Sequence, residues 1–258
     1  MILSLILNFS KQDLKDKYTG SVLGGLWAFI IPLTNILMFT LIFSKIMGAR
    51  LGSVGAGFEE YGYSIYLICG IVPWAAFSST LLRVTTVYRD KAGLIGKVQL
   101  SLLILPVYIV LSESFVFFVS MIFFIGFLLL IGFPLDVHWL FIPCVFLIQQ
   151  ILAFSIGLVL AVLSVFVEDI REMMPVLVQF WFWLTPVVYV VTILPSEYME
   201  FMAVNPYYHF AQAYRDIVIG HQTPDFSILL KMLGLSLLIF GFGSFLLKKL
   251  ERDIRDFV

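Results

Sequence analysis

Four consecutive aromatic residues, Phe180 to Trp183, stand in a long apolar stretch and are followed by Tyr189. Four successive rings point all around a helix, so some of them must face away from lipid. Flat apolar rings stack on the C–H faces of sugars, and their weakly directional contacts let a chain slide. A path for a sugar polymer is therefore physically sensible, although rings near the ends of a membrane span also serve as interface anchors.

A second candidate for chemistry is Glu113, which lies about 12 residues, or roughly 18 Å, into another apolar stretch. An ionisable residue at membrane depth is by default a functional candidate. We expect it to be neutral, or paired with Arg83 or with a polar group of another helix. The amides of Asn35, Gln149 and Gln150 are expected to form hydrogen bonds between helices, worth about 1 kcal/mol each.

The sequence lacks the residues that nucleotide hydrolysis or catalysis within the membrane would need. A phosphate-binding loop would be placed at Gly96-Lys97, but Val98 follows where Ser or Thr is needed, and Lys91 occupies the upstream glycine position. If the protein uses ATP, a partner must hydrolyse it. A membrane enzyme built on Ser244 would need a base, and no predicted span contains a histidine. We expect no catalytic residue, no metal site and no cofactor bound by this chain.

The composition indicates the solvent in which the helices that carry these residues must fold. Of the 258 residues, 61% are hydrophobic and only 13% are charged, and the mean hydropathy is +1.02. This balance excludes an ordinary water-soluble fold and requires lipid as the main solvent. The net charge of −1 argues against a nucleic-acid partner. Cys69 and Cys144 form no disulfide framework and no metal-ligand spacing.

Apolar runs long enough to cross the bilayer predict an all-α membrane protein with six transmembrane helices. The predicted spans are 25–47, 62–83, 102–131, 139–166, 174–194 and 227–247. The third must tilt, kink near Pro106 or Gly126, or project beyond the bilayer. With a cytoplasmic N-terminus, the cytoplasmic segments hold 12 of the 16 lysines and arginines. The positive-inside rule therefore places both termini in the cytoplasm.

We expect one transmembrane domain, 1–258, with specialised segments outside the spans. Residues 1–24 form an amphipathic interface helix, spans one to five occupy 25–194, and 226–258 hold span six and a cytoplasmic tail. Residues 195–225 form two short external helices, the second capped by Asn205-Pro206. These are either re-entrant helices or a surface cap over the bundle. The compact loops 84–101 and 167–173 are large enough for docking.

Ordered motifs run along the whole chain. They are Asp13-Leu14-Lys15-Asp16-Lys17-Tyr18, Ser21-Val22-Leu23-Gly24, Trp27, Pro32-Leu33, Gly70-Ile71-Val72-Pro73-Trp74, Phe166-Val167-Glu168-Asp169-Ile170, Leu184-Thr185-Pro186-Val187-Val188-Tyr189, Asn205-Pro206 and Lys248-Lys249-Leu250-Glu251-Arg252-Asp253-Ile254. In combination the chain resembles the membrane (permease) subunits of ATP-binding-cassette polysaccharide exporters, above all those for lipid-linked O-antigen.

The resemblance implies a passive conduit in the cytoplasmic (inner) membrane. Two copies of the chain would pair around a polymer channel, and two nucleotide-binding subunits would supply ATP and Mg²⁺. Their closure would move the docking loops, tilt the spans and open the path for a lipid-linked polysaccharide. The implied channel aromatics are Trp181, Trp183, Tyr189, Phe180, Trp27 and Trp74. The implied ATPase-docking residues are Arg89, Asp90, Lys91, Lys97, Glu168, Asp169, Ile170 and Arg171. The implied external gate is Asn205, Pro206, Tyr207 and Tyr208.

The chain also departs from the family pattern. Glu168 stands where the family often has Arg, and Gln12 where it often has Arg before the first Asp. The first change exchanges a cation for an anion in the docking turn, so that pairing there could involve Arg171 instead. Permeases for capsule polysaccharide or teichoic acid remain alternatives within the family. A secondary carrier without an ATPase partner is an alternative of another class, although it would show inverted repeats, and none is seen.

Overall fold

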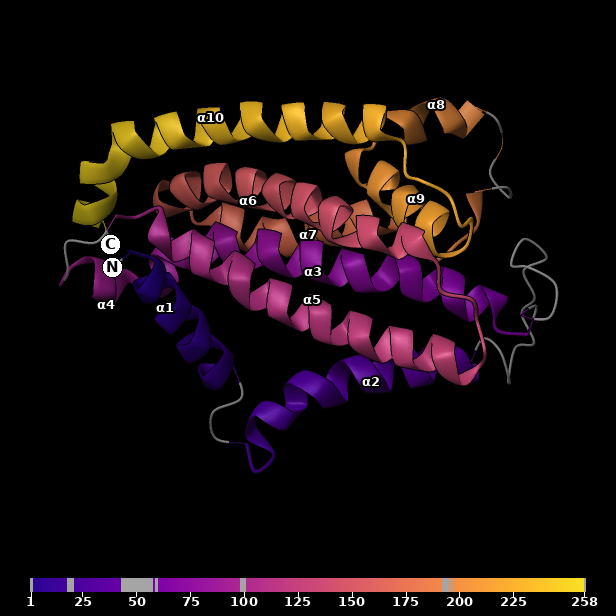
Figure 1. Ribbon diagram of the computed structural model, residues 1–258. Helices are drawn as coiled ribbons and strands as arrows, with labels where there is room; N and C mark the ends of the chain where they lie inside the picture. The colour runs from indigo at the N-terminus through magenta and orange to yellow at the C-terminus, as the bar shows by residue number, and fades with distance from the viewer. Residues whose placement is uncertain are drawn as a thin grey trace.

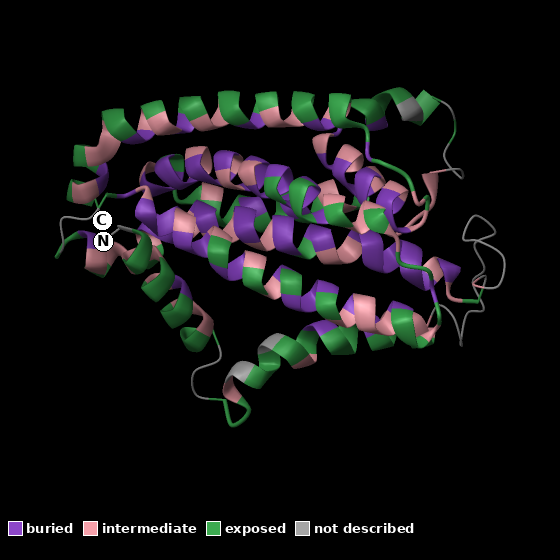
Figure 2. Ribbon diagram, in the orientation of Figure 1, coloured by how far each residue is buried: buried purple, intermediate pink, exposed green. Residues whose placement is uncertain are grey.

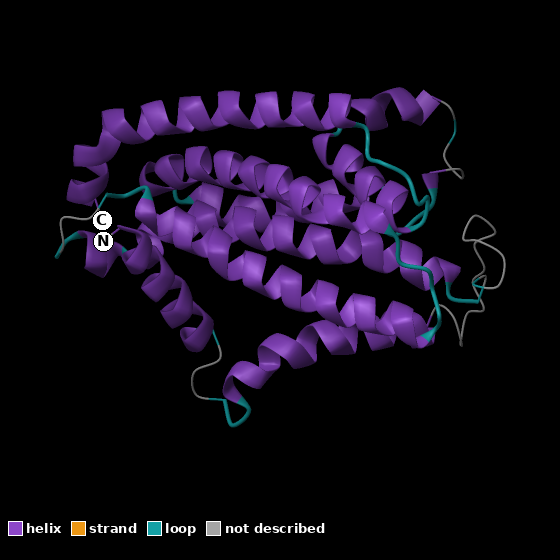
Figure 3. Ribbon diagram, viewed as in Figure 1, coloured by secondary structure: helices purple, strands orange, loops and turns teal. Residues whose placement is uncertain are grey.

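The computed structural model describes residues 2–17, 21–42, 58, 60–97, 101–191, 195 and 197–257. Within these ranges the chain consists of helices joined by turns, with no strand (Figure 3). The α-helices are α1 (Ile2–Asp16), α2 (Trp27–Phe39), α3 (Gly62–Asp90), α4 (Ala92–Ile95), α5 (Ile104–Leu130), α6 (Ile142–Phe166), α7 (Asp169–Trp183), α8 (Glu197–Val204), α9 (Pro206–Val218) and α10 (Phe226–Phe257). Two short 3₁₀-helices, η1 (Gly24–Leu26) and η3 (Val137–Phe141), precede α2 and α6. The prediction of an all-α membrane protein is confirmed.

Four of the described helical segments are long and apolar enough to cross a membrane. They are Gly62–Asp90, Ile104–Leu130, Val137–Phe166 and Phe226–Phe257, which correspond to predicted spans two, three, four and six. The helices α3 and α10 continue well beyond the predicted limits of 83 and 247. Apolar windows end at the first charges, whereas helical hydrogen bonding does not, and Arg255 pairs with Glu251 one turn away in α10.

The helices in predicted spans one and five are shorter. The α2 helix has 13 residues and α7 has 15. The α7 helix begins at Asp169, before the predicted limit of 174, and it ends at Trp183 rather than 194. Pro186 explains the early end, because a residue before proline is disfavoured in the helical conformation. The count of six spans therefore stays a prediction.

The long helices run side by side, and the two chain termini lie at the same end of the bundle (Figure 1). The most extensive contacts join α6 to α10 and α6 to α3, and α5 packs against α3. At Gly157 in α6 an added Cβ would lie 2.8 Å from a methyl group of Val84, so only glycine permits this close approach to α3. The outer face of α10 is exposed along its length, as expected of a lipid-facing helix (Figure 2).

The two short helices predicted between spans five and six are α8 and α9, at the end of the bundle opposite the termini (Figure 1). Asn205 caps α9 as predicted, since its side chain accepts a hydrogen bond from the Tyr207 N–H, and Pro206 is the first helical residue. One face of α9 is completely buried against α3 and α6, including Phe210 and Ile217. We therefore refer to the two ends of the bundle as the terminus end and the α9 end.

Candidate functional site

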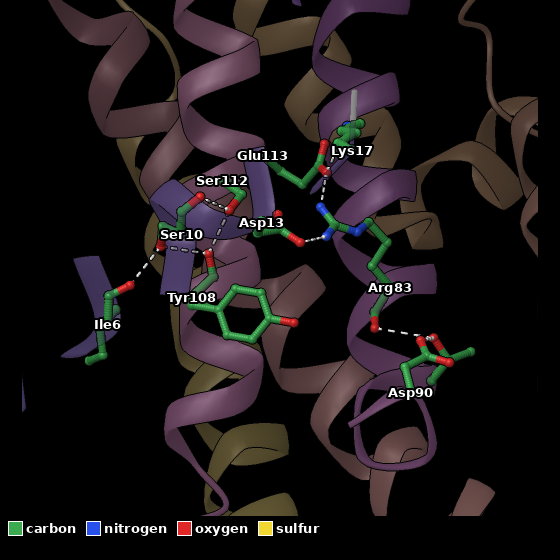
Figure 4. A network of polar contacts seen from close by, with 10 residues as sticks. Ile6, Ser10, Asp13, Lys17, Arg83, Asp90, Tyr108, Ser112 and Glu113 are labelled. Carbon is green, nitrogen blue, oxygen red and sulfur yellow. Dashed lines mark hydrogen bonds and ion pairs between the residues drawn. The ribbon is translucent and has the colours of Figure 1, made fainter. Parts of the chain in front are cut away.

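At the terminus end, four ionisable side chains from three elements meet between α1, α3 and α5 (Figure 4). Glu113 of α5 is only 3% exposed and forms ion pairs with Arg83 of α3 and, at 3.2 Å, with the Nζ of Lys17. The second terminal nitrogen of Arg83 pairs with Asp13 of α1. Of the alternatives for Glu113, pairing with Arg83 is confirmed. Two acids and two bases form a neutral group, which we call the ion-pair cluster.

Hydroxyl groups next to the ion-pair cluster reinforce the attachment of α1 to α5. The Ser10 Oγ donates to the carbonyl oxygen of Tyr108 at 3.1 Å, and the Ser112 Oγ reaches the Ser10 carbonyl at 3.4 Å. The ring of Phe9 packs on that of Tyr108. Within the predicted segment 1–24, a helix is thus present over residues 2–16 and is fixed to the bundle by charged, polar and apolar contacts together. Its location at a membrane interface stays a prediction.

Two of the predicted docking residues bind each other at the terminus end. The Arg89 Nη1 lies 2.7 Å from the Glu168 Oε1, and the Arg89 Nη2 donates to the Val165 carbonyl at 2.8 Å. The hydrogen bond from Arg89 lowers the pKa of the Glu168 carboxyl from its ordinary value. Glu168 pairs with Arg89 rather than Arg171, so the change from the family pattern creates a link between α3 and the turn before α7.

The other predicted docking residues lie around this link. Lys91 lies over the ring of Tyr108 at 5.9 Å, and Ile170 packs against the apolar core. The rest are exposed: Asp90, Lys97, Asp169 and Arg171. Arg89, Glu168 and Arg171 line a cleft of about 500 Å³ that also reaches Phe257 of α10. This cleft presents both positively and negatively charged side chains to a partner protein.

At the α9 end, Asn205 connects three elements. Its Oδ1 accepts hydrogen bonds from the Trp181 Nε1 at 2.8 Å and from the Tyr207 N–H, and its Nδ2 lies 2.8 Å from the Thr185 Oγ1. The side chain thereby joins the end of α7 and the following turn to the start of α9. Residues Thr185 and Asn205 belong to two motifs that the sequence separates by 20 positions. We call this arrangement the Asn205 junction.

Next to this junction, Arg215 of α9 is buried, with 4% of its surface exposed. Its Nη2 donates to the carbonyl oxygens of Pro186 and Val187 at 2.7 and 3.0 Å, and its guanidinium lies 3.7 Å from the centre of the Tyr66 ring. Within the described residues its Nε and Nη1 have no hydrogen-bond partner. The charge is therefore held mainly by the backbone dipoles of the turn after α7.

Gly70 permits this turn to approach α3. An added Cβ at Gly70 would lie 2.9 Å from the Val187 carbonyl oxygen and 3.1 Å from the Arg215 Nη2. On the same helix, Tyr63 and Tyr66 donate hydrogen bonds to the carbonyl oxygens of Val188 and Tyr189. The turn after α7 is thus held by side chains of α3 and α9.

The predicted channel aromatics fall into two environments. Trp74 is 7% exposed and packs against Trp181 and Tyr207 inside the chain. Phe180 and Trp183, by contrast, are 63% and 58% exposed. These two rings line an open apolar groove of about 350 Å³ on α7, together with Pro175, Val176 and Gln179.

The remaining aromatics lie beside these environments. Tyr189 is partly exposed and donates a hydrogen bond to the Trp183 carbonyl at 3.1 Å, and the Trp27 Nε1 donates to Ser21. In the predicted gate, Tyr207 is buried and the side chains of Pro206 and Tyr208 are half-buried. Which rings face a channel stays a prediction.

Sequence reasoning missed the roles of Arg215, Thr185 and Lys17. The sequence around Arg215 gives no signal of its burial, because Asp216 follows it directly and Gln212 lies one turn before it. Thr185 and Lys17 lie inside the family motifs, but nothing in the motifs shows which residues they contact. Among the described residues, no group of three or more His, Cys, Asp or Glu is placed to hold a metal ion.

Comparison with known proteins gives independent evidence about the family of this chain. Residues 5–219 match the family described as ABC-2 type transporter. The O-antigen export system permease protein RfbA of Myxococcus xanthus is 23% identical over 254 residues, which cover 98% of this chain and 94% of that protein. A protein of the same name from Klebsiella pneumoniae is 24% identical over 246 residues, covering 95% and 92%. The polysialic acid transport protein KpsM of Escherichia coli is 20% identical over 209 residues, covering 81% and 78%.

Proposed function

The chain belongs to the ABC-2 type transporter family, and from this premise we propose that it is the membrane subunit of an exporter of lipid-linked polysaccharide of the O-antigen type. The observation that carries the proposal is the nearly full-length similarity to permeases named for O-antigen export. The helical fold of the described residues, with four long apolar helices, agrees with a membrane-spanning subunit.

We place the chain in the cytoplasmic (inner) membrane with six spans and both termini in the cytoplasm. In support, both termini and α4 lie at one end of the bundle (Figure 1), and the basic residues Arg89, Lys91 and Lys97 flank α4 in the sequence. In this topology α2 and α7 belong to spans one and five, and α8 and α9 form the external re-entrant segment. Burial of one face of α9 between α3 and α6 supports re-entrance over a surface cap.

The assembly in this proposal contains two copies of the chain and two ATP-binding subunits, which hold ATP and Mg²⁺. The ATP-binding subunits dock at the terminus end, on the cleft lined by Arg89, Glu168 and Arg171. Because Arg89 ties α3 to the turn before α7, a push on this turn moves both helices. Docking and movement of the spans are thereby coupled through one ion pair.

The polysaccharide path runs along the exposed aromatic groove of α7, where Phe180 and Trp183 present open rings. Trp181 and Trp74 act behind it, because they pack in the interior and connect α7 with α3. The Asn205 junction closes the α9 end of this path. Movement of α7 pulls Trp181 and Thr185 away from Asn205 and opens the gate.

Two alternatives are less well supported. Export of a capsule polysaccharide is supported by similarity to KpsM, but at lower identity and coverage than the O-antigen permeases. A proton-coupled secondary carrier needs an acid that is free to exchange a proton at membrane depth. Glu113 is engaged by both Arg83 and Lys17, which leaves it poorly suited to this role.

The experiment that tests the proposal is translocation in proteoliposomes containing the chain with its ATP-binding partner. Lipid-linked O-antigen should reach the opposite leaflet only when ATP is hydrolysed. A Phe180→Ala/Trp183→Ala variant should lose most of the transport while the partner still binds. The matched control is Phe242→Ala/Phe245→Ala, which removes two similarly exposed rings from α10. Equal translocation without ATP would refute the proposed function.

A further inference from the structure

A cavity of about 250 Å³ lies between α2, α3 and α5, away from the aromatic groove of α7. Its walls have similar lengths on the three helices: Ile31 to Phe39 on α2, Ile71 to Ser79 on α3 and Glu113 to Ser120 on α5. At 1.5 Å per residue, each wall covers roughly 10–12 Å along its helix. The cavity is therefore a slot that runs along the helices.

The two ends of the slot differ in polarity. Lys17 and Glu113 of the ion-pair cluster lie at the end towards α1, whereas the opposite end is lined by apolar side chains such as Phe39 and Ile71. Ile31 and Asn35 on the α2 wall are both exposed, so the slot opens sideways towards the surrounding membrane. A charged end at the level of a surface helix and an apolar shaft have the layout of a phospholipid.

Lys17 is the cation available to a lipid phosphate. Its side chain is 35% exposed and its ammonium contacts Glu113 at 3.2 Å, which leaves donors for another oxygen. Glu113 does not depend on Lys17 for neutralisation, because Arg83 also pairs with it. Basic pockets on the cytoplasmic side of membrane helices are typical binding sites for lipid headgroups.

We propose that this slot binds one acyl chain of a membrane glycerophospholipid, whose phosphate is bound by Lys17. With about 250 Å³ and a length of roughly 10–12 Å, the slot takes the first part of one unbranched acyl chain, and the rest of the chain lies in the surrounding bilayer. The lipid fills the space that side chains leave between α2 and the α3–α5 pair. It thereby joins α1 and α2 to the bundle, and this role does not depend on what the protein transports.

The test is titration of the delipidated full-length chain with phosphatidylglycerol, followed by native mass spectrometry. The wild type should bind one phosphatidylglycerol in a saturable manner. Ala75→Phe places a ring in the slot from an exposed position and should abolish this binding, whereas Ala203→Phe, the same exchange on α8, should not affect it. Equal binding by the two variants would overturn the proposal.

The phosphate contact is tested separately by Lys17→Gln, which keeps Glu113 paired with Arg83. It should weaken binding about fivefold, the effect of one basic residue near a lipid surface, and Lys15→Gln should leave binding unchanged. Diacylglycerol, which has no phosphate, should bind the wild type about as weakly as phosphatidylglycerol binds the Lys17 variant. Identical affinities for Lys17→Gln and Lys15→Gln would contradict the phosphate contact.

A competition arm distinguishes the source of the lipid. Phosphatidylethanolamine has the same phosphate and acyl chains, and should displace phosphatidylglycerol. Polyprenyl phosphate should leave the bound phosphatidylglycerol in place. Displacement by polyprenyl phosphate at equal concentration would refute the glycerophospholipid as the occupant.

Discussion

Arg83 and Arg215 both lie among packed helices, at opposite ends of the bundle, but different groups hold them. At the terminus end, Arg83 reaches two carboxylates, Asp13 from α1 and Glu113 from α5. At the α9 end, Arg215 forms no ion pair with any residue that the structure describes. It is held by two backbone carbonyls and by the ring of Tyr66.

This difference has a consequence for motion. The ion-pair cluster is neutral and draws its partners from three elements, so it fixes their relative positions. The partners of Arg215 are carbonyls of a turn, and any shift of the turn removes them from a charge that has little access to water. We infer that α1, α3 and α5 move as one rigid unit at the terminus end, and that the contacts within the α9 end are the ones that change during transport.

The largest expected effect is that of Arg83→Ala. The substitution leaves the Asp13 and Glu113 carboxylates near each other without a shared cation, and breaking a buried ion pair in this way costs about 3–5 kcal/mol. Thermal unfolding in detergent should show a large fall in the midpoint. A variant as stable as the wild type would contradict the rigid role of the cluster.

A smaller effect is expected for Arg215→Met. The change removes two hydrogen bonds from a charged donor, but it also removes a buried charge that lacks a carboxylate, so the two effects partly cancel. We expect a loss of about 1–2 kcal/mol in the same unfolding measurement, with increased hydrogen exchange in residues 184–190. A loss larger than that of Arg83→Ala would reverse the comparison between the two ends.

The smallest effect concerns Asp136, whose carboxylate receives contacts from His138 at 2.8 Å and His221 at 3.0 Å. Partial burial acts to raise its pKa, but the two histidine hydrogen bonds prevail and lower the pKa of the Asp136 carboxyl. A lowered pKa gives stability that is present above about pH 4 and is lost as the pH falls through the folded-state value.

We therefore expect Asp136→Asn to destabilise the protein at pH 6 by less than about 1 kcal/mol, because these groups are partly exposed. At pH 3 the difference from the wild type should shrink, and thermal unfolding at both pH values measures it. A difference that grows at pH 3 would contradict the stated sign.

The structural features that could be predicted from the sequence are those that depend on residues close together in the chain. The Asn205-Pro206 cap needs only neighbouring residues, and it appears as expected. The pairing of Glu113 with Arg83 was among the alternatives that the sequence offered, because an acid at membrane depth needs a polar or charged partner from another helix. The burial of Arg215 was not, because its partners on α3 and in the turn after α7 are distant in sequence. Likewise, four consecutive rings do not reveal which of them neighbouring helices shield, and here Trp181 is half-buried whereas Trp183 is exposed.

In the proposed function the Asn205 junction opens for export, and a reversible cross-link across the junction is the sharpest test of this opening. Thr185→Cys and Asn205→Cys replace two contacting side chains, in a background where Cys69 and Cys144 are serine. A short cleavable thiol cross-linker joins them after reconstitution with the ATP-binding partner. We predict that cross-linking stops ATP-driven glycan translocation and that its cleavage restores it. Undiminished translocation by the fully cross-linked protein would contradict the claim.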